Sequence, residues 1–222
     1  MECPRVTLTD LTLTDRKPLV MVTAYDAASA RLTDSAGVDL ILVGDTLAEF
    51  TLGYDSTTPV TVNEMLHHCQ AVTRIQPRAF VVGDMPLGSY QVSKEEAVRN
   101  AIRFVKVGGV DAVKIEGGKV REETIRAIAE AGIAVMGHIG FTPQSAVSFG
   151  SQIVAGRDAQ SAIEIYRDAL ALQEAGCFAI VLEVIPAALG AEISQALRIP
   201  TVGIGAGSGC DGEIQVWHDI LG

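Results

Sequence analysis

Short apolar runs alternate with helix-like stretches along the whole chain. The run from Val38 to Val43 is almost unbroken, as expected of a strand that is buried on both faces of a parallel sheet. Comparable runs predict strands at 19–23, 38–43, 79–82, 112–115, 134–136, 178–182 and 201–204, with 213–221 as a candidate eighth. The stretches between them predict helices at 27–36, 61–75, 93–106, 119–131, 158–175 and 186–197.

This alternation of strands and helices predicts the architecture. A strand, a helix and a second parallel strand are joined by a right-handed crossover, and repeated crossovers build a parallel sheet. Eight such units favour a closed barrel over an open sheet, and 222 residues are enough for one. We therefore expect an α/β protein, a (β/α)8 TIM barrel that occupies residues 1–222 as a single domain.

Charge and cysteine content narrow the class of protein. A formal net charge of −10 disfavours a nucleic-acid partner, because phosphate binding needs a basic surface. The four cysteines, Cys3, Cys69, Cys177 and Cys210, are widely separated and have no zinc-site spacing, which suits a reducing, cytoplasmic compartment. We see no signal-peptide pattern and no apolar stretch long enough to cross a membrane.

Carboxylates follow three of the predicted strands at the point where each strand ends. Taken singly, Asp45, Asp84 and Glu116 could each be a helix cap or a turn residue. In a parallel barrel, however, all strand ends meet at the C-terminal mouth, where such barrels carry their chemistry. Carboxylates crowded there repel one another unless they are protonated or bridged by a cation. An all-oxygen set favours Mg2+ over Zn2+, so these residues predict a magnesium site.

Lys114 and Glu116 lie two residues apart, so on a strand they face the same side. One alternative is a surface ion pair worth about 0–1 kcal/mol. The apolar neighbours Val113 and Ile115 favour a buried strand instead, with Lys114 in the mouth as a cationic partner for a substrate carboxylate or keto oxygen.

Two further strand ends carry candidate catalytic groups. Glu183 follows an apolar strand and is either a cap for the next helix or a carboxylate in an apolar setting, which suits a general base. His138 is either a hydrogen-bonded structural side chain or a pocket residue. The glycine-rich segment from Gly203 to Gly209 matches neither the dinucleotide fingerprint nor a P-loop, so we expect its glycines to allow close backbone approach.

Several segments, taken in order, resemble the ketopantoate hydroxymethyltransferase family over essentially the whole chain. They are Thr23–Asp26, Val43–Thr46, Tyr54–Val60, Gly83–Pro86, Val113–Gly118, Gly137–Ser145, Leu182–Glu183 and Val202–Gly207. The resemblance implies a barrel of the phosphoenolpyruvate/pyruvate superfamily. It also implies transfer of a hydroxymethyl unit from 5,10-methylenetetrahydrofolate to 3-methyl-2-oxobutanoate. The product would be 2-dehydropantoate, made for pantothenate biosynthesis through a Mg-stabilised enolate.

The resemblance also assigns roles residue by residue. Asp45 and Asp84 match the Mg2+ ligands and Glu116 the acid that completes the metal site. Substrate contacts fall on Thr46 and Lys114, on the two aspartates, and on His138 in the pocket, while Glu183 matches the catalytic proton acceptor. Family members form homo-oligomers, typically decamers, and we expect a homo-oligomer here.

The chain departs from the family pattern at several positions. Thr46 replaces a usual serine, Ala48-Glu49 a usual Gly-Met, and Gly150-Ser151 a usual Gly-Gly. Because family members continue beyond the position of Gly222, we expect the closing C-terminal helix to lie outside this sequence.

Two alternative functions remain. One is a Mg-dependent carbon–carbon lyase or mutase of the same superfamily, although the Lys-Cys-Gly-His motif of the lyases is absent. The other is a non-catalytic metabolite-binding barrel.

Overall fold

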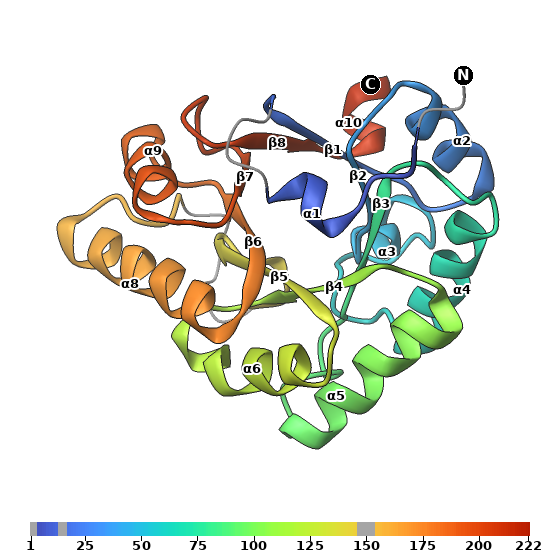
Figure 1. Ribbon diagram of the computed structural model, residues 1–222, viewed down its shortest axis with the longest axis horizontal. Coiled ribbons are helices and arrows are strands. Elements are labelled where there is room, and N and C mark those ends of the chain that lie inside the picture. Colours follow the sequence, from blue (N-terminus) through green and yellow to red (C-terminus); the bar gives the residue numbers. More distant parts are fainter. Residues whose placement is uncertain (1–3, 13–16, 146–153) are drawn as a thin grey trace.

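The computed structural model describes residues 4–12, 17–145 and 154–222, so Cys3 and Gly150-Ser151 lie outside it. Within this part, eight parallel strands close into a barrel in chain order (Figure 1). They are β1 (Leu19–Thr23), β2 (Leu40–Val43), β3 (Phe80–Asp84), β4 (Ala112–Glu116), β5 (Ala134–Gly140), β6 (Cys177–Glu183), β7 (Thr201–Ile204) and β8 (Gly212–Gln215). The predicted (β/α)8 architecture is confirmed.

Helices surround the barrel and cover the outer face of its strands (Figure 1). The predicted ones are confirmed as α2 (Ala27–Ser35), α4 (Val62–Thr73), α5 (Lys94–Arg103), α6 (Glu122–Glu130), α8 (Ala159–Ala175) and α9 (Ala187–Ala196). A π-helical turn, η1 (Phe104–Gly108), extends α5, and two 3-10 turns occur at η2 (Lys119–Arg121) and η3 (Pro143–Ser145). Short helices not predicted are α1 (Leu8–Leu11), α3 (Leu47–Phe50) and α10 (Trp217–Leu221).

Side-chain caps start four of these helices. Asp26, Thr61, Ser93 and Asp158 each accept a hydrogen bond from the backbone N–H three residues later. Such a cap satisfies one of the donors that a helix start leaves free. Gly176 ends α8 with a φ of 103°, a left-handed conformation that glycine adopts without steric penalty.

The prediction of a strand over 213–221 was wrong in its second half. Strand β8 ends at Gln215, and the chain then turns into α10. The turn is held where the Trp217 N–H donates to the Thr23 hydroxyl at the end of β1, over 2.9 Å. A short helix therefore follows β8, where we had expected none within the sequence.

Strand residues alternate between two apolar clusters, and this alternation determines what reaches the barrel interior. Leu40 and Leu42 belong to the inner cluster, whereas Ile41 and Val43 belong to the one between strands and helices. Leu11 of α1 is only 1% exposed and joins the inner cluster, consistent with α1 lying across the end of the barrel nearest the viewer in Figure 1.

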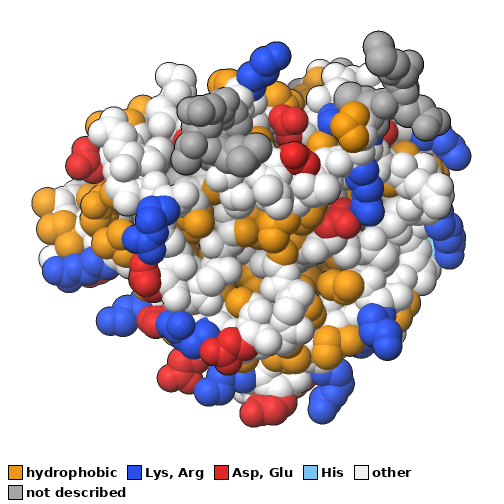
Figure 2. All heavy atoms as spheres, in the orientation of Figure 1, with side chains coloured by type: hydrophobic (Ala, Val, Ile, Leu, Met, Phe, Trp, Pro, Cys, Tyr) orange, Lys and Arg blue, Asp and Glu red, His pale blue; other side chains and the backbone are white. Residues whose placement is uncertain are grey.

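The outer surface presents no continuous basic patch on the face seen in Figure 2, where acidic and basic side chains are interspersed. This agrees with the acidic net charge. In the described ranges, no helix has the length and apolarity needed to cross a bilayer.

Candidate active site

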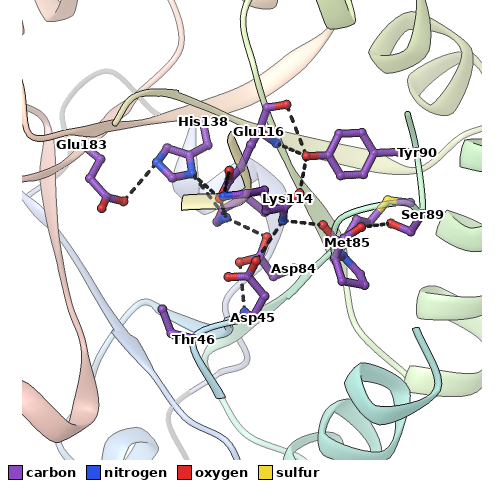
Figure 3. Close-up of polar contacts among 12 residues, drawn as sticks. Asp45, Thr46, Asp84, Met85, Ser89, Tyr90, Lys114, Glu116, His138 and Glu183 are labelled. Carbon is purple, nitrogen blue, oxygen red and sulfur yellow. Dashed lines mark hydrogen bonds and ion pairs between the residues drawn. The ribbon is translucent and has the colours of Figure 1, made fainter. Parts of the chain in front are cut away.

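The inward-facing positions of β3 to β6 become polar towards the C-terminal ends of these strands. Alternate residues of a strand face the same side. Four apolar residues belong to the inner cluster: Val82, Ala112, Met136 and Val181. The residues two or four positions later therefore also face the interior, and they are Asp84, Lys114, Glu116, His138 and Glu183. Strand pairing places Asp84 opposite Lys114 and Glu116 opposite His138. Neighbouring strands thus build one polar layer at the mouth (Figure 3).

Lys114 is the buried cation of this layer. Its Nζ lies 2.7 Å from Asp84 Oδ1 and 3.8 Å from Glu116 Oε1, and all three side chains are at most 4% exposed. Burial alone lowers the pKa of Lys114, but the Asp84 and Glu116 carboxylates outweigh burial and raise that pKa above its usual range. Lys114 therefore stays charged, and the alternative of a surface ion pair is excluded.

Asp45 and Asp84 form a close carboxylate pair. Asp45 follows β2, is 2% exposed, and donates its backbone N–H to Asp84 Oδ2 over 3.2 Å. Burial, and then the charge of Asp84, raise the pKa of Asp45 well above its usual value. Burial also raises the pKa of Asp84, although Lys114 offsets part of this effect. An added cation beside this pair would relieve both effects.

His138 bridges two glutamates. Its Nδ1 lies 3.4 Å from Glu116 Oε1 and its Nε2 lies 3.1 Å from Glu183 Oε2. Burial and the nearby Lys114 lower the pKa of His138, but the two glutamates outweigh them and raise it to about 9. The same imidazole and Lys114 outweigh the burial of Glu116 and lower the pKa of that carboxyl. The layer is thus a chain of alternating charges.

Glu183 does not lie in the apolar setting that its sequence neighbours suggested. Its partner is the His138 ring, and its side chain is 21% exposed, the largest fraction among the members of the polar layer that form ion pairs. The next residue, Val184, has a φ of 48°, which is strained for a β-branched side chain. Backbone strain of this kind concentrates at functional sites.

Thr46 lies at the edge of the layer. Its hydroxyl is 2.8 Å from the Tyr25 hydroxyl. Glu49, which adds a charge where the family pattern has methionine, is exposed on α3 and does not line the mouth cavity. That cavity measures about 70 Å3 and is lined by every candidate residue of the sequence analysis: Asp45, Thr46, Asp84, Lys114, Glu116, His138 and Glu183.

Gln144 and Tyr90 are buried residues of the site to which the sequence analysis gave no role. The Gln144 side chain donates to Asp45 Oδ2 over 2.9 Å, and its backbone N–H donates to Glu116 Oε2 over 3.0 Å. The Tyr90 hydroxyl donates to Gln144 Oε1 over 2.7 Å. Gln144 lies in the Gly137–Ser145 segment, but no spacing or periodicity there singles it out.

The donor set fits Mg2+ with few protein ligands. Among the described residues, no three His, Cys, Asp or Glu side chains converge closely enough to form a complete metal site. Mg2+ commonly binds through one or two carboxylates and retains water or substrate oxygens at the remaining positions. The buried Asp45–Asp84 pair matches that pattern. Glu116 is adjacent, and its buried Oε1 has no hydrogen bond of good geometry within the described part of the chain.

The glycine-rich segment after β7 packs against α9. A Cβ on Gly207 would lie 2.3 Å from the Ala187 Cβ, and one on Gly209 would lie 2.6 Å from the Ala191 Cβ. These glycines allow close packing of the loop on the helix, as the sequence predicted.

Comparison with known proteins gives a consistent result. The model of the family described as ketopantoate hydroxymethyltransferase matches residues 5–222. A relative from Moorella thermoacetica, 3-methyl-2-oxobutanoate hydroxymethyltransferase, is 56% identical over 92% of this chain and 76% of its own length. The protein of the same name from Heliobacterium modesticaldum is 53% identical, over 93% of this chain and 75% of its own.

A solved structure shares the fold at low sequence identity. 2,3-Dimethylmalate lyase, a member of the PEP mutase/isocitrate lyase superfamily, superposes with a TM-score of 0.70 at 20% identity, over 95% of this chain and 81% of its own. At this sequence identity the similarity shows a shared barrel fold and carries no information about the reaction.

Proposed function

The chain belongs to the ketopantoate hydroxymethyltransferase family, and on that basis we propose how its barrel mouth performs the family reaction. The protein is a 3-methyl-2-oxobutanoate hydroxymethyltransferase. In our proposal it transfers the one-carbon unit of 5,10-methylenetetrahydrofolate to the branched carbon of 3-methyl-2-oxobutanoate, forming 2-dehydropantoate.

The observation that carries the proposed mechanism is the chain of contacts from Asp84 through Lys114, Glu116 and His138 to Glu183. At one end lies the Asp45–Asp84 carboxylate pair, which suits a metal cation, together with the charged Lys114, which suits an oxyanion of the substrate. At the other end lies Glu183, the most exposed carboxylate among these contacts. A proton can therefore be removed at one end while negative charge is stabilised at the other.

Asp45 and Asp84 would hold Mg2+, and Glu116 lies beside them. The ion, when bound, withdraws electron density from the keto group and so makes the neighbouring C–H bond more acidic. Lys114 and the Thr46 hydroxyl orient the keto acid. The Lys114 charge stabilises the negative charge that develops on the keto oxygen.

Glu183 acts as the base that removes the proton from the branched carbon. His138 holds one carboxylate oxygen of Glu183 at 3.1 Å, which leaves the other oxygen for the substrate. The carbanion equivalent then forms a C–C bond to the folate-derived methylene carbon. Both C–N bonds of that carbon break, one water supplies the hydroxyl oxygen of the product, and tetrahydrofolate leaves with one proton from Glu183 and one from the water on its two nitrogens. A general base of this kind contributes about 10²–10⁴-fold to a rate.

A second cavity, of about 510 Å3, offers room for the folate. It adjoins the mouth, because Gly117 and Thr142 line it while their chain neighbours Glu116 and Pro143 line the mouth cavity. Its volume lies in the usual range for ligand sites, and Asp168 in its wall offers a carboxylate to the N–H groups of a pterin.

The family match favours the transferase over the lyase or mutase alternative. The family model matches residues 5–222, whereas the lyase likeness is limited to 20% identity and therefore to the fold. The carboxylate pair, Lys114 and Glu183 line one cavity, which also argues against a barrel without catalysis.

We further propose a homo-oligomer that works in the cytoplasm, with a decamer as the expected assembly. The described cysteines, Cys69, Cys177 and Cys210, are unpaired, which fits a reducing compartment. Native mass spectrometry of the purified protein would give the size of the assembly.

Proton exchange tests the proposed mechanism. The protein is incubated with 3-methyl-2-oxobutanoate in D2O, and loss of the branched-carbon proton is followed by NMR with and without Mg2+. We expect protein-dependent exchange that requires Mg2+ but no folate, and 2-dehydropantoate once methylenetetrahydrofolate is added. The absence of exchange in every condition would overturn the mechanism.

A further inference from the structure

The Gln144 side chain has partners on all sides. It is 5% exposed, and Nε2 donates to Asp45 Oδ2 and to the Met85 carbonyl, each over 2.9 Å. On the other side, Oε1 accepts from the Tyr90 hydroxyl at 2.7 Å and from Gln91 Nε2 at 3.4 Å. Two donor and two acceptor positions are thus used, which is the full capacity of an amide.

These contacts allow only one orientation of the amide. A flipped amide would place Oε1 against the Asp45 carboxylate and the Met85 carbonyl, so that acceptors would face acceptors without a hydrogen. It would also turn Nε2 toward the Gln91 amino group, which is itself a donor. The orientation of Gln144 is therefore defined by its surroundings, and with it the position of Asp45 Oδ2.

The same residue also holds a second carboxylate. The Gln144 backbone N–H donates to Glu116 Oε2 over 3.0 Å. Gln144 thus contacts Asp45 after β2 through its side chain and Glu116 on β4 through its backbone. It belongs to η3, so its backbone position is set by that turn rather than by either strand.

Tyr90 supports this arrangement from behind. Besides its contact with Gln144, its hydroxyl accepts a hydrogen bond from the Glu116 backbone N–H over 3.2 Å, and the side chain is 1% exposed. Tyr90 therefore links Gln144 to the strand that carries Glu116. Its hydroxyl contacts the Gln144 amide and the Glu116 backbone, the latter visible in Figure 3, rather than the Glu116 carboxylate.

We propose that Gln144 is a positioning residue, which fixes the Asp45 and Glu116 carboxylates in the orientation that binds a divalent cation at the mouth. Gln144 holds Asp45 Oδ2, so Oδ1 of the same carboxylate is left for the ion. Outer partners of metal ligands act in this way, and their loss typically costs about 10–100-fold in metal affinity. The inference rests on the proposed magnesium site, but assigns a role to a residue outside it.

The test measures cation binding without substrate. Mn2+ serves as the probe, its free fraction is measured by EPR, and the variants are Gln144→Met and Tyr90→Phe. Gln144→Met keeps the length of the side chain and removes both side-chain donors and acceptors. Gln70→Met, on the outer helix α4, is the matched control. Melting temperature and circular dichroism report folding separately from binding.

We expect Gln144→Met to weaken Mn2+ binding about 10–100-fold. Tyr90→Phe should weaken it in the same direction but less, and Gln70→Met should leave it unchanged. In turnover assays the Mg2+ concentration for half-maximal rate should rise in the same order, with kcat recovered at saturating Mg2+.

Two results would overturn the proposal, and they are distinguishable. If wild type binds Mn2+, Asp84→Asn abolishes binding, and Gln144→Met binds like wild type, Gln144 has no positioning role while the metal site stands. If wild type itself binds no Mn2+, the metal site and the role of Gln144 both fall. Should Gln144→Met fail to fold, Tyr90→Phe decides: unchanged affinity refutes the proposal, and weaker binding at an unchanged melting temperature supports it.

Discussion

His138 Nε2 lies 3.1 Å from Glu183 Oε2, while the opposite ring nitrogen lies 3.4 Å from Glu116 Oε1. One imidazole therefore joins the carboxylate that we propose as base to the carboxylate beside the cation site. Burial and Lys114 lower the pKa of His138, but the two glutamates outweigh them and raise that pKa to about 9, which favours the charged form of the ring between the two carboxylates. The position of Glu183 thus depends on a residue of the neighbouring strand.

Replacing Glu183 tests the base directly. We expect Glu183→Gln to reduce proton exchange at the branched carbon about 10²–10⁴-fold, because an amide cannot accept the proton. Mn2+ affinity should be unchanged, since Glu183 is not among the residues that hold the ion. Glu192→Gln on the exposed surface of α9 is the control. Exchange at the wild-type rate in Glu183→Gln would remove this residue from the mechanism.

Lys114 should contribute to stability as well as to catalysis. Lys114→Met leaves the buried Asp84 carboxylate without its cation and Glu116 with His138 alone, and breaking a buried pair in this way costs about 3–5 kcal/mol. Urea unfolding without Mg2+ measures this change, with the exposed Lys106→Met as control. Added Mg2+ should restore part of the loss. A variant as stable as wild type would contradict the charge arrangement described above.

The helix cap at Asp26 predicts a pH-dependent effect away from the site. The Ser29 backbone N–H lowers the pKa of Asp26, so the folded state favours the carboxylate. Its stabilisation is present above the unfolded pKa of about 3.8 and is lost as the pH falls through the lower folded value. Asp26→Ala should cost about 1 kcal/mol at pH 7.

Urea unfolding at pH 7 and at pH 3 measures the difference in free energy of unfolding between wild type and Asp26→Ala, which should be smaller at pH 3. Asp26→Asn keeps a capping oxygen without the charge. The difference in free energy of unfolding between Asp26→Asn and Asp26→Ala should therefore not depend on pH. An equal gap between wild type and Asp26→Ala at both pH values would refute the assignment to a charged cap.

The proposed folate cavity predicts a selective kinetic change. Asp168 Oδ1 accepts the Lys119 backbone N–H over 2.8 Å, an interaction that an asparagine oxygen can keep. Asp168→Asn should therefore fold normally, raise the KM for methylenetetrahydrofolate, and leave the KM for the keto acid and the folate-free exchange unchanged. An unchanged folate KM would place the folate elsewhere without affecting the proposed chemistry at the mouth.

Much of the fold could be predicted because its information is local. Apolar runs and the period of two along each strand define both the strands and the side that each residue faces. For that reason the sequence predicted that Asp84, Lys114 and Glu116 would share the barrel mouth. The C-terminal segment could not be predicted in this way, because the Thr23 hydroxyl that turns the chain at Trp217 is remote in sequence.

The sequence by itself determined the barrel, the strand ends and the acidic character of the mouth, since each depends on neighbours along the chain. Only the tertiary structure decided which groups touch. The contacts of Gln144 with Asp45 and Glu116 span 99 and 28 residues, and Glu183 meets His138 rather than an apolar wall. Such pairs form because barrel closure brings distant strand ends together, and the short range of hydrogen bonds and buried ion pairs then makes their strength depend on that closure.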